Sequence, residues 1–261
     1  MIRVEGLSKV FHSRDGGSVV ALHDVSMEVA RNEFVSLVGP SGCGKSTMLR
    51  LVAGLVGATR GVLEIDGTAV TEPRRDIGIV FQSPTLLPWA DITDNVLFPL
   101  RLMRETARDA RARAHALLEL VGLKGFESRY PRELSGGMQQ RAAICRALIH
   151  DPDILLMDEP FGALDALTRE VMSMELLRIW TENPKTIVFV THSISEAVLL
   201  SDRVIVMSPR PGRIAEVVEV PIERPRTLDM EGSREFQECT RRIRRRIFGA
   251  DETDLSGPAA A

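Results

Sequence analysis

The chain has 261 residues, 44% hydrophobic and 26% charged, which are ordinary values for a globular protein with a substantial core and argue against a largely disordered chain. The formal net charge of −3 gives no general attraction to nucleic acid. No apolar stretch reaches the length that spans a bilayer, and the first residues lack the long apolar segment of a secretory signal, so we expect a cytoplasmic chain.

The beginning of the chain predicts an antiparallel β flap. Residues 2–7 and 19–29 are β-type runs separated by the turn HSRDGG. The apolar run FVSLV at residues 34–38 then predicts a buried strand, which leads into the glycine-rich GPSGCGKST and the helix candidate MLRLVAGL. Strand, glycine-rich loop and helix in this order are typical of a phosphate-binding loop.

Residues 39–46 read GPSGCGKS, which matches the phosphate-loop pattern GxxxxGKS in the context that its mechanism requires. Glycines let backbone N–H groups converge on phosphate oxygens, and the helix adds its positive N-terminal end. Lys45 is expected to place a cation on the β and γ phosphates, and Ser46 to offer its hydroxyl to Mg²⁺. The residues predicted to bind nucleotide here are Gly39, Pro40, Ser41, Gly42, Cys43, Gly44, Lys45, Ser46 and Thr47.

Later apolar runs predict a mostly parallel sheet, because near-continuous β-branched runs indicate strands covered on both faces. These runs are IGIVF (77–81), ILLMD (154–158), TIVFV (186–190) and RVIVM (203–207). Between the first two, the arginine-rich residues 91–121 are expected to be helical and, with residues 122–150, to form a helical insertion. One more strand is expected at 214–220, then a helix at 233–248 and a disordered Pro/Ala tail.

We therefore predict an α/β fold with a P-loop NTPase core, an N-terminal antiparallel β subdomain and a helical insertion. The ATPase domain is expected over residues 1–220, with the helical subdomain at about 83–150. Residues 221–261 are expected to form a short C-terminal extension with a helix and a disordered tail.

Two adjacent carboxylates follow the apolar run ILLM. Asp158 ends the predicted strand, where a second protein oxygen for Mg²⁺ is expected, although an acid that caps the next turn is the alternative. The side chain of Glu159 should point away from the strand in a different direction from that of Asp158, and its carboxylate can orient and deprotonate an attacking water. On spacing alone, an ordinary surface glutamate remains the alternative for Glu159.

Together with the phosphate loop, three further motifs resemble the ATP-binding-cassette (ABC) ATPases. They are LSGGMQQR at 134–141, LLMDEPFGALD at 155–165, and His192 in VTH. The resemblance covers about residues 1–220 and implies an ATP hydrolase with ATP and Mg²⁺ as its cofactors.

The LSGGMQQR motif opens the amphipathic helix candidate MQQRAAICRALI. Ser135, Gly136 and Gly137 there make a second helix start that can bind an anion, whereas an ordinary serine N-cap is the alternative. The resemblance implies that this segment closes over the ATP held by another subunit, so that hydrolysis requires a head-to-tail homodimer.

The resemblance also implies roles for four other residues. Gln82 is expected to contact Mg²⁺ and the attacking water and to relay nucleotide state to membrane subunits, with a polar residue at a strand end as the alternative. His192 is expected to contact the γ-phosphate, with a solvated histidine as the alternative. Asp165 is expected to link the two sites of the dimer. Phe11 is expected to stack on adenine, with a core position as the alternative.

For the cysteines and for the C-terminal arginines we favour an interpretation without a special function. Cys43 lies where the family's phosphate loop commonly has cysteine, and phosphoryl transfer to water needs no covalent step, so it is assigned backbone contacts only. Cys43, Cys145 and Cys239 show no metal-ligand spacing and are predicted to be free thiols. The arginines at 241–246 either face anionic lipid or are cations near a helix C-terminus, and we favour the second.

The chain carries neither a fused membrane domain, a long coiled coil nor a second cassette, which favours the separate subunit of an importer. SPTLLPWADITDNVLFPL and MSPRPGRIAEVVEVPIERPR resemble the subgroup serving nitrate, sulfonate, taurine and related solutes. Expected partners are integral-membrane permease subunits and, indirectly, a solute-binding protein, with no nucleic acid, at the cytoplasmic face of the membrane. An ABC-type ATPase acting on nucleic acid is the main alternative, and import of a pyrimidine or aromatic acid is another.

Overall fold

The computed structural model describes residues 1–12, 15–104 and 109–249 of the chain. These residues form two compact units. The first unit comprises Met1–Glu72 with Phe189–Ala261, and the second comprises Pro73–Val188. The Pro/Ala tail that was expected to be disordered lies outside the described residues.

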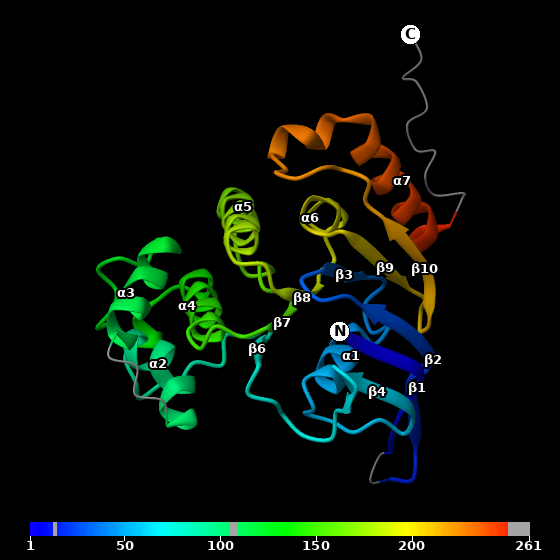
Figure 1. Ribbon diagram of the computed structural model, residues 1–261, viewed down its shortest axis with the longest axis horizontal. Coiled ribbons are helices and arrows are strands. Elements are labelled where there is room, and N and C mark those ends of the chain that lie inside the picture. Colours follow the sequence, from blue (N-terminus) through cyan, green and yellow to red (C-terminus); the bar gives the residue numbers. More distant parts are fainter. Residues whose placement is uncertain (13–14, 105–108, 250–261) are drawn as a thin grey trace. The chain divides into compact units, whose positions relative to one another are not determined.

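An antiparallel sheet forms the N-terminal part of the first unit (Figure 1), as predicted. Its strands, in the spatial order β2-β1-β4-β5, are β1 (Ile2–His12), β2 (Ser18–Val29), β4 (Arg60–Ile65) and β5 (Thr68–Ala69). The hairpin of β4 and β5 was not predicted. Asp66 and Gly67 connect these strands with φ values of 49° and 74°, which suit a two-residue turn.

Three further strands of the first unit carry the glycine-rich loop at one end. β3 (Phe34–Val38) is buried at every residue and pairs in parallel with β9 (Arg203–Met207), and β10 (Ile214–Glu219) pairs antiparallel with β9. The predicted buried strand at 34–38 is therefore confirmed. The loop that follows β3 leads into α1 (Lys45–Val52).

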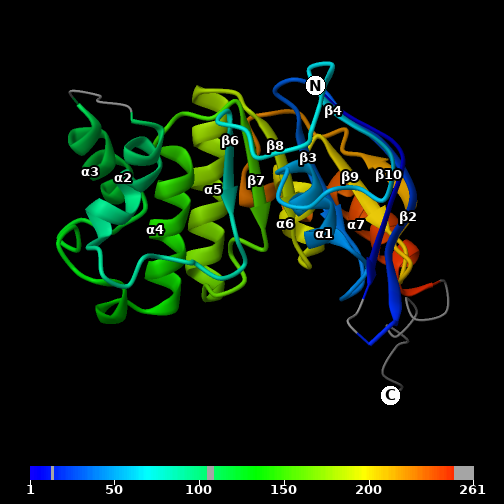
Figure 2. The ribbon, with the colours of Figure 1, turned by 90° about the horizontal axis from the view of Figure 1, so that it is seen from below.

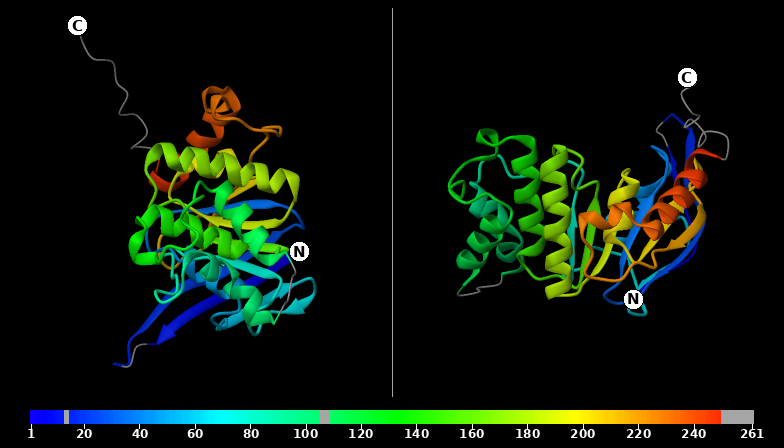
Figure 3. Two further views of the ribbon diagram at one scale, coloured as in Figure 1. Left: turned by 90° about the vertical axis from the view of Figure 1, so that its left-hand side faces the viewer. Right: turned by 90° about the horizontal axis from the view of Figure 1, so that it is seen from above.

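Two α-helices and a 3₁₀ turn complete the first unit: α6 (Ile194–Leu200), η2 (Leu228–Gly232) and α7 (Arg234–Phe248). The orange-red α7 contacts β10 and α6 (Figures 1 and 3). Phe236, Cys239 and Ile243 are buried on one stripe of α7, at the spacing of an amphipathic helix. Ser233, where the helix was predicted to begin, is its N-cap and accepts a 3.3 Å hydrogen bond from the amide of Phe236.

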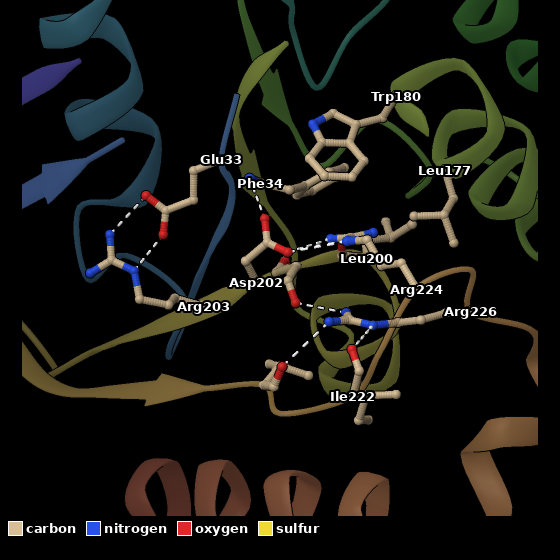
Figure 4. Close-up of polar contacts among 12 residues, drawn as sticks. Glu33, Phe34, Leu177, Trp180, Leu200, Asp202, Arg203, Ile222, Arg224 and Arg226 are labelled. Atoms are coloured by element: carbon tan, nitrogen blue, oxygen red, sulfur yellow. Dashed lines mark hydrogen bonds and ion pairs between the residues drawn. The ribbon is translucent and has the colours of Figure 1, made fainter. Parts of the chain in front are cut away.

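The segment IERPR fastens the C-terminal part of the chain to α6 (Figure 4). Arg226 is only 3% exposed, and its guanidinium donates to backbone oxygens that the end of a helix leaves unpaired. These are the oxygens of Val198, Leu199 and Ser201, at 3.0, 3.2 and 2.7 Å. Burial lowers the pKa of Arg226 to about 10, so the group remains a cation at neutral pH.

The neighbouring Arg224 links the same segment to β3. Its guanidinium donates to Asp202 Oδ1 at 2.9 Å and to Leu200 O at 2.7 Å. The other carboxylate oxygen of Asp202 accepts a 2.9 Å hydrogen bond from the amide of Phe34, the first residue of β3. Figure 4 shows these contacts with the ion pair of Arg203 and Glu33, which binds the start of β9 to the turn before β3.

The second unit contains three strands and most of the helices. Its elements are β6 (Ile77–Val80), α2 (Ile92–Met103), α3 (Ala110–Leu120), η1 (Pro131–Glu133), α4 (Gly136–Leu148), β7 (Ile154–Asp158), α5 (Ala166–Glu182) and the first three residues of β8 (Thr186–Val190). β6 and β7 pair in parallel and follow β8 in the order β8-β7-β6. The α/β fold with a mostly parallel core sheet is therefore confirmed.

Helices α2, α3 and α4 pack on one another, as Figure 2 shows, within the region where a helical insertion was predicted. A Cβ added to Gly78 would lie 2.5 Å from Ala147 O, so only glycine lets β6 and α4 approach this closely. Among the helices that the structure describes, none combines the length and apolar character needed to cross a bilayer.

Candidate nucleotide-binding and hydrolysis site

The phosphate loop (residues 39–46) depends on its first and last glycines. Gly39 has φ 153°, and a Cβ there would lie 2.8 Å from Met207 O. Gly44 has φ 104°, and a Cβ there would lie 2.6 Å from Leu22 Cδ2. Both positions therefore require glycine, which explains why the chain can turn tightly between β3 and α1.

Lys45 lies inside the loop. The residue is 7% exposed, and its ammonium donates to Gly39 O at 2.8 Å and to Pro40 O at 3.1 Å. These are neutral oxygens of the loop itself, so phosphate oxygens can replace them without displacing a competing ion pair. Ser41 and Gly42 are exposed, whereas Ser46 and Thr47 at the start of α1 are half-buried.

The three cysteines are free thiols and all are buried. Cys43 has no exposed surface, and its sulfur lies 3.7 Å from Lys45 Nζ. Burial raises the pKa of Cys145 strongly and that of Cys239 as well, which keeps both thiols protonated at neutral pH.

Phe11 is an exposed residue of β1 rather than a core residue. It is 42% exposed, and the ammonium of Lys9 lies 5.0 Å from its ring centroid, a cation–π contact. The ring therefore has surface available for a ligand, and its role in binding adenine stays a prediction.

His192 lies exposed in the turn between β8 and α6. The preceding Thr191 is buried and donates to Glu196 Oε2 at 2.6 Å, and its hydroxyl accepts from the amide of Ser193 at 3.0 Å. Ser193 in turn caps α6. Sequence reasoning missed these supports, although Ser-Ile-Ser-Glu at 193–196 has the spacing of a helix capping box.

The second unit brings two of the predicted catalytic residues together. Gln82 follows β6 by two residues, and its Nε2 donates to Glu159 Oε2 at 3.1 Å. Glu159 has φ 47°, a left-handed conformation that non-glycine residues rarely adopt and that occurs preferentially at functional sites. Asp158, 6% exposed, ends β7 immediately before it.

Residues from α4 hold the backbone around Gln82. Gln140 is fully buried and donates to Phe81 O at 3.0 Å. Arg146 donates to Pro84 O at 2.8 Å and to Thr85 O at 2.8 Å. Sequence reasoning missed both residues, because the sequence of a helix does not indicate which distant carbonyl group a polar side chain will bind.

The segment LSGGM (134–138) begins α4 as predicted. Ser135 is the N-cap and accepts a 3.3 Å hydrogen bond from the amide of Met138. Ser135 and Gly136 are exposed, with open space where a Cβ on Gly136 would lie. A Cβ on Gly137 would lie 3.0 Å from Leu164 Cδ2, so this segment packs closely against the chain next to Asp165.

Asp165 is the N-cap of α5. Its carboxylate accepts from the hydroxyl of Thr168 at 2.7 Å and from the amide of Thr168 at 3.0 Å. These two hydrogen bonds, the hydroxyl first, lower the pKa of Asp165 below its ordinary value. Its predicted part in linking two sites remains a prediction.

Three residues of the chain are predicted to bind Mg²⁺. Ser46 belongs to the first unit, and Gln82 and Asp158 belong to the second. Each residue offers a hard oxygen donor of the kind that Mg²⁺ accepts beside phosphates: the hydroxyl of Ser46 is half-buried, Gln82 has an amide oxygen, and the carboxylate of Asp158 is nearly buried.

Comparisons with known proteins agree with these features. Residues 22–162 match the ABC transporter family. The chain is 48% identical over 220 residues to a taurine import ATP-binding protein of Jannaschia sp., covering 84% of this chain and 82% of that protein. It is 42% identical over 242 residues to an aliphatic sulfonates import ATP-binding protein of Bacillus cereus, covering 93% and 94%.

A solved structure shows the same fold: the dimeric structure of a post-hydrolysis state of an ATP-binding cassette bound to ADP and Pi. It aligns with a TM-score of 0.78 and 34% identity, covering 85% of this chain and all of that one. The chain therefore belongs to the ABC transporter family, as one of its ATP-hydrolysing, ATP-binding subunits.

Proposed function

We propose that this chain is the ATPase subunit of an importer that takes up a small solute, such as nitrate, a sulfonate, taurine or a related compound. The observation that carries the proposal is its 48% and 42% identity to taurine and sulfonate import ATP-binding proteins over more than four fifths of the chain. The ATPase does not itself bind the solute, so this similarity supports the class of solute and not one compound.

In the proposed reaction, Lys45 and the amides of the phosphate loop bind the β and γ phosphates of ATP. Ser46, Gln82 and Asp158 supply protein oxygens to Mg²⁺, which would offset the charge of the phosphates. Glu159 takes the proton of the attacking water, and its hydrogen bond from Gln82 orients the carboxylate for that task. His192, exposed at the carboxyl end of β8, contacts the γ-phosphate.

The proposed working unit is a homodimer in which LSGGM of one subunit closes over the ATP of the other. The exposed Ser135 and Gly136 at the start of a 13-residue helix support this role, because such a helix start attracts anions. The dimeric assembly of the similar cassette supports it as well.

An apolar groove in the second unit supports a permease partner. The groove has a volume of about 310 Å³, and two of its apolar residues, Phe98 and Leu102, are 38% and 73% exposed. It is also lined by Thr85 and Arg146, whose hydrogen bonds hold the segment after Gln82. We propose that a short cytoplasmic segment of the permease occupies this groove, which would place the chain at the cytoplasmic face of the membrane.

The test is reconstitution with the permease and solute-binding protein encoded with this chain. We expect taurine or an alkanesulfonate to stimulate ATP hydrolysis in proteoliposomes severalfold. Leu102→Glu should abolish assembly with the permease without changing basal hydrolysis, whereas Leu55→Glu, at a 45% exposed leucine of the first unit, should assemble normally. Stimulation by DNA and not by any permease would refute the importer assignment.

A further inference from the structure

The turn that joins β9 to β10 (residues 208–213, SPRPGR) lies against the phosphate loop, and no catalytic role has been assigned to it so far. Its ends are closed by hydrogen bonds from Ser208 N to Arg213 O at 2.9 Å and from Arg213 N to Ser208 Oγ at 3.1 Å. Gly212 also bonds to β2 on both sides, to Ala21 O at 3.0 Å and from the amide of His23 at 2.9 Å. The turn is therefore fixed to β2 as well as to β9 and β10, the strands that it joins.

Gly212 brings the backbone of this turn into direct contact with the phosphate loop. A Cβ at this position would lie 1.9 Å from Cys43 O and 3.1 Å from Leu22 Cδ2. No side chain can occupy that space, because real Cβ atoms do not approach other atoms so closely. The turn therefore abuts the loop at the carbonyl group of Cys43.

Arg210 contacts the preceding peptide of the loop, between Gly42 and Cys43, through its side chain. Its Nε donates to Gly42 O at 3.2 Å, and its Nη2 lies 3.5 Å from where a Cβ of Gly42 would be. In a planar trans peptide the C=O and the following N–H point in opposite directions. The hydrogen bond on Gly42 O therefore also fixes the direction of the Cys43 N–H.

The Cys43 N–H points into the phosphate loop. It donates to Pro40 O at 3.3 Å, the same oxygen that accepts from Lys45 Nζ at 3.1 Å. Inward N–H groups are what a phosphate loop uses to bind phosphate oxygens. Arg210 thus binds the carbonyl oxygen of the Gly42–Cys43 peptide, and the N–H of the same peptide belongs to the phosphate-binding surface.

We propose that Arg210 is a positioning residue for nucleotide binding: it orients the peptide between Gly42 and Cys43 so that the Cys43 N–H faces the phosphates. The proposal rests on the proposed function, since it presumes that the loop binds ATP. Arg210 acts through the loop and does not touch the nucleotide. A cation suits the task because it strengthens the hydrogen bond to a partly exposed carbonyl.

The test compares three variants. Arg210→Ala removes the donor, and Arg210→Lys keeps one donor and the charge. Arg213→Ala is the matched control, because it removes an equal charge from the same turn, and within the described chain no hydrogen bond joins the Arg213 side chain to the phosphate loop. Each variant is measured for ADP affinity, for melting temperature without nucleotide, and for the Cys43 amide resonance in nucleotide-free protein.

We expect Arg210→Ala to weaken ADP binding about three- to tenfold, the range for losing one ordinary hydrogen bond, because Arg210 acts on the nucleotide only through the loop. It should shift the Cys43 amide resonance and leave the nucleotide-free melting temperature unchanged, and Arg210→Lys should recover most of the affinity. Equal weakening by Arg213→Ala, or an unmoved Cys43 resonance, would overturn the proposal. If the wild type binds ADP and Lys45→Ala does not, an ADP affinity of Arg210→Ala equal to that of the wild type refutes only this inference. If the wild type binds no nucleotide, the proposed function itself fails.

Discussion

The Nε2 atom of Gln82 donates a 3.1 Å hydrogen bond to Oε2 of Glu159, which joins a residue just after β6 to the residue just after β7. The two strands pair in parallel, so their carboxyl ends meet at one edge of the sheet. This contact keeps a carboxylate and an amide together at that edge.

Glu159→Gln is expected to lower multiple-turnover hydrolysis by about 10²- to 10⁴-fold, because the amide keeps the shape of the side chain but cannot accept a proton. Binding of Mg-ATP should persist and should hold a stable dimer. Steady-state phosphate release and equilibrium nucleotide binding measure the two effects. Glu223→Gln, at an exposed glutamate, is the control and should behave as wild type. Near-normal turnover of the Glu159 variant would remove this residue from the base role.

Mixed dimers test whether each ATP is shared between subunits. Lys45→Ala should lose charge-assisted contacts with phosphate worth roughly 1.5–3 kcal/mol. Ser135→Arg should block closure sterically, because Ser135 lies exposed at the helix start. In a mixed dimer both lesions fall in one site and the other site stays intact, so about one ATP per dimer should be trapped.

Both lesions are introduced into the Glu159→Gln background, and occluded nucleotide is scored instead of turnover. The two homodimers, each with two damaged sites, are the controls and should trap none. If verified mixed dimers also trap no ATP, the shared-site mechanism is wrong and only ordinary nucleotide binding remains.

Maleimide is expected to inactivate the protein slowly through Cys43. The thiol has no exposed surface in this structure, so reaction requires the phosphate loop to open, and Mg-ATP should protect by holding it closed. Cys43→Ser should remain active and become resistant. The measurement is residual hydrolysis against time of exposure. Inactivation of the serine variant at the original rate would place the blocking thiol elsewhere.

Phe11→Ala is expected to weaken ATP binding by about 0.5–1.5 kcal/mol if the ring stacks on adenine, a range taken from aromatic pairs. Inorganic triphosphate, which has no base, should bind as before. Val19→Ala is a matched control, since Val19 is the exposed cross-strand partner of Phe11. Calorimetric titration separates these cases, and an unchanged ATP affinity in the folded variant would exclude the stacking role.

Asp151→Asn is expected to lower stability at pH 7 and to have less effect in acid. Asp151 accepts a 2.5 Å hydrogen bond from the buried Lys185, and this contact lowers the pKa of Asp151. A lowered folded-state pKa stabilises the protein above the unfolded value of about 3.9 and stops doing so as the pH falls through the folded value.

Because the carboxylate of Asp151 is 54% exposed, the loss at pH 7 should be about 1 kcal/mol or less. Melting temperatures of the variant and the wild type, compared at pH 7 and at about pH 2, well below the unfolded value, measure the difference. Asp153→Asn, at an exposed aspartate nearby, is the control. A difference that grows toward acid would contradict the sign of the effect.

The strands whose burial could also be predicted from sequence are those covered on both faces. FVSLV, ILLMD and TIVFV are near-continuous apolar runs, and each proved to be a fully buried strand. The hairpin of β4 and β5 escaped notice because only alternate residues of β4 are covered and β5 has two residues. The Asp66-Gly67 turn was its clearest signal. The division of the chain at residue 220 stays a prediction.

The site shows the same limit of sequence reasoning. Lys45, Glu159 and Ser135 could be found because motif spacing fixes their local geometry. The residues that hold the backbone around Gln82, namely Gln140 and Arg146, act on carbonyls 59 to 62 positions away in the chain. Such contacts depend on packing between elements, which no local pattern encodes.

The buried Arg226 has a practical consequence for anyone who joins this chain to another protein. It occupies the last carbonyl groups of α6, the helix that begins two residues after His192. Cutting the chain after Val220 would leave those groups without their donor and expose the surfaces of β10 and α6 that α7 contacts. A tag or reporter should therefore be fused after Gly249. A truncated version of the chain should retain residues 221–249.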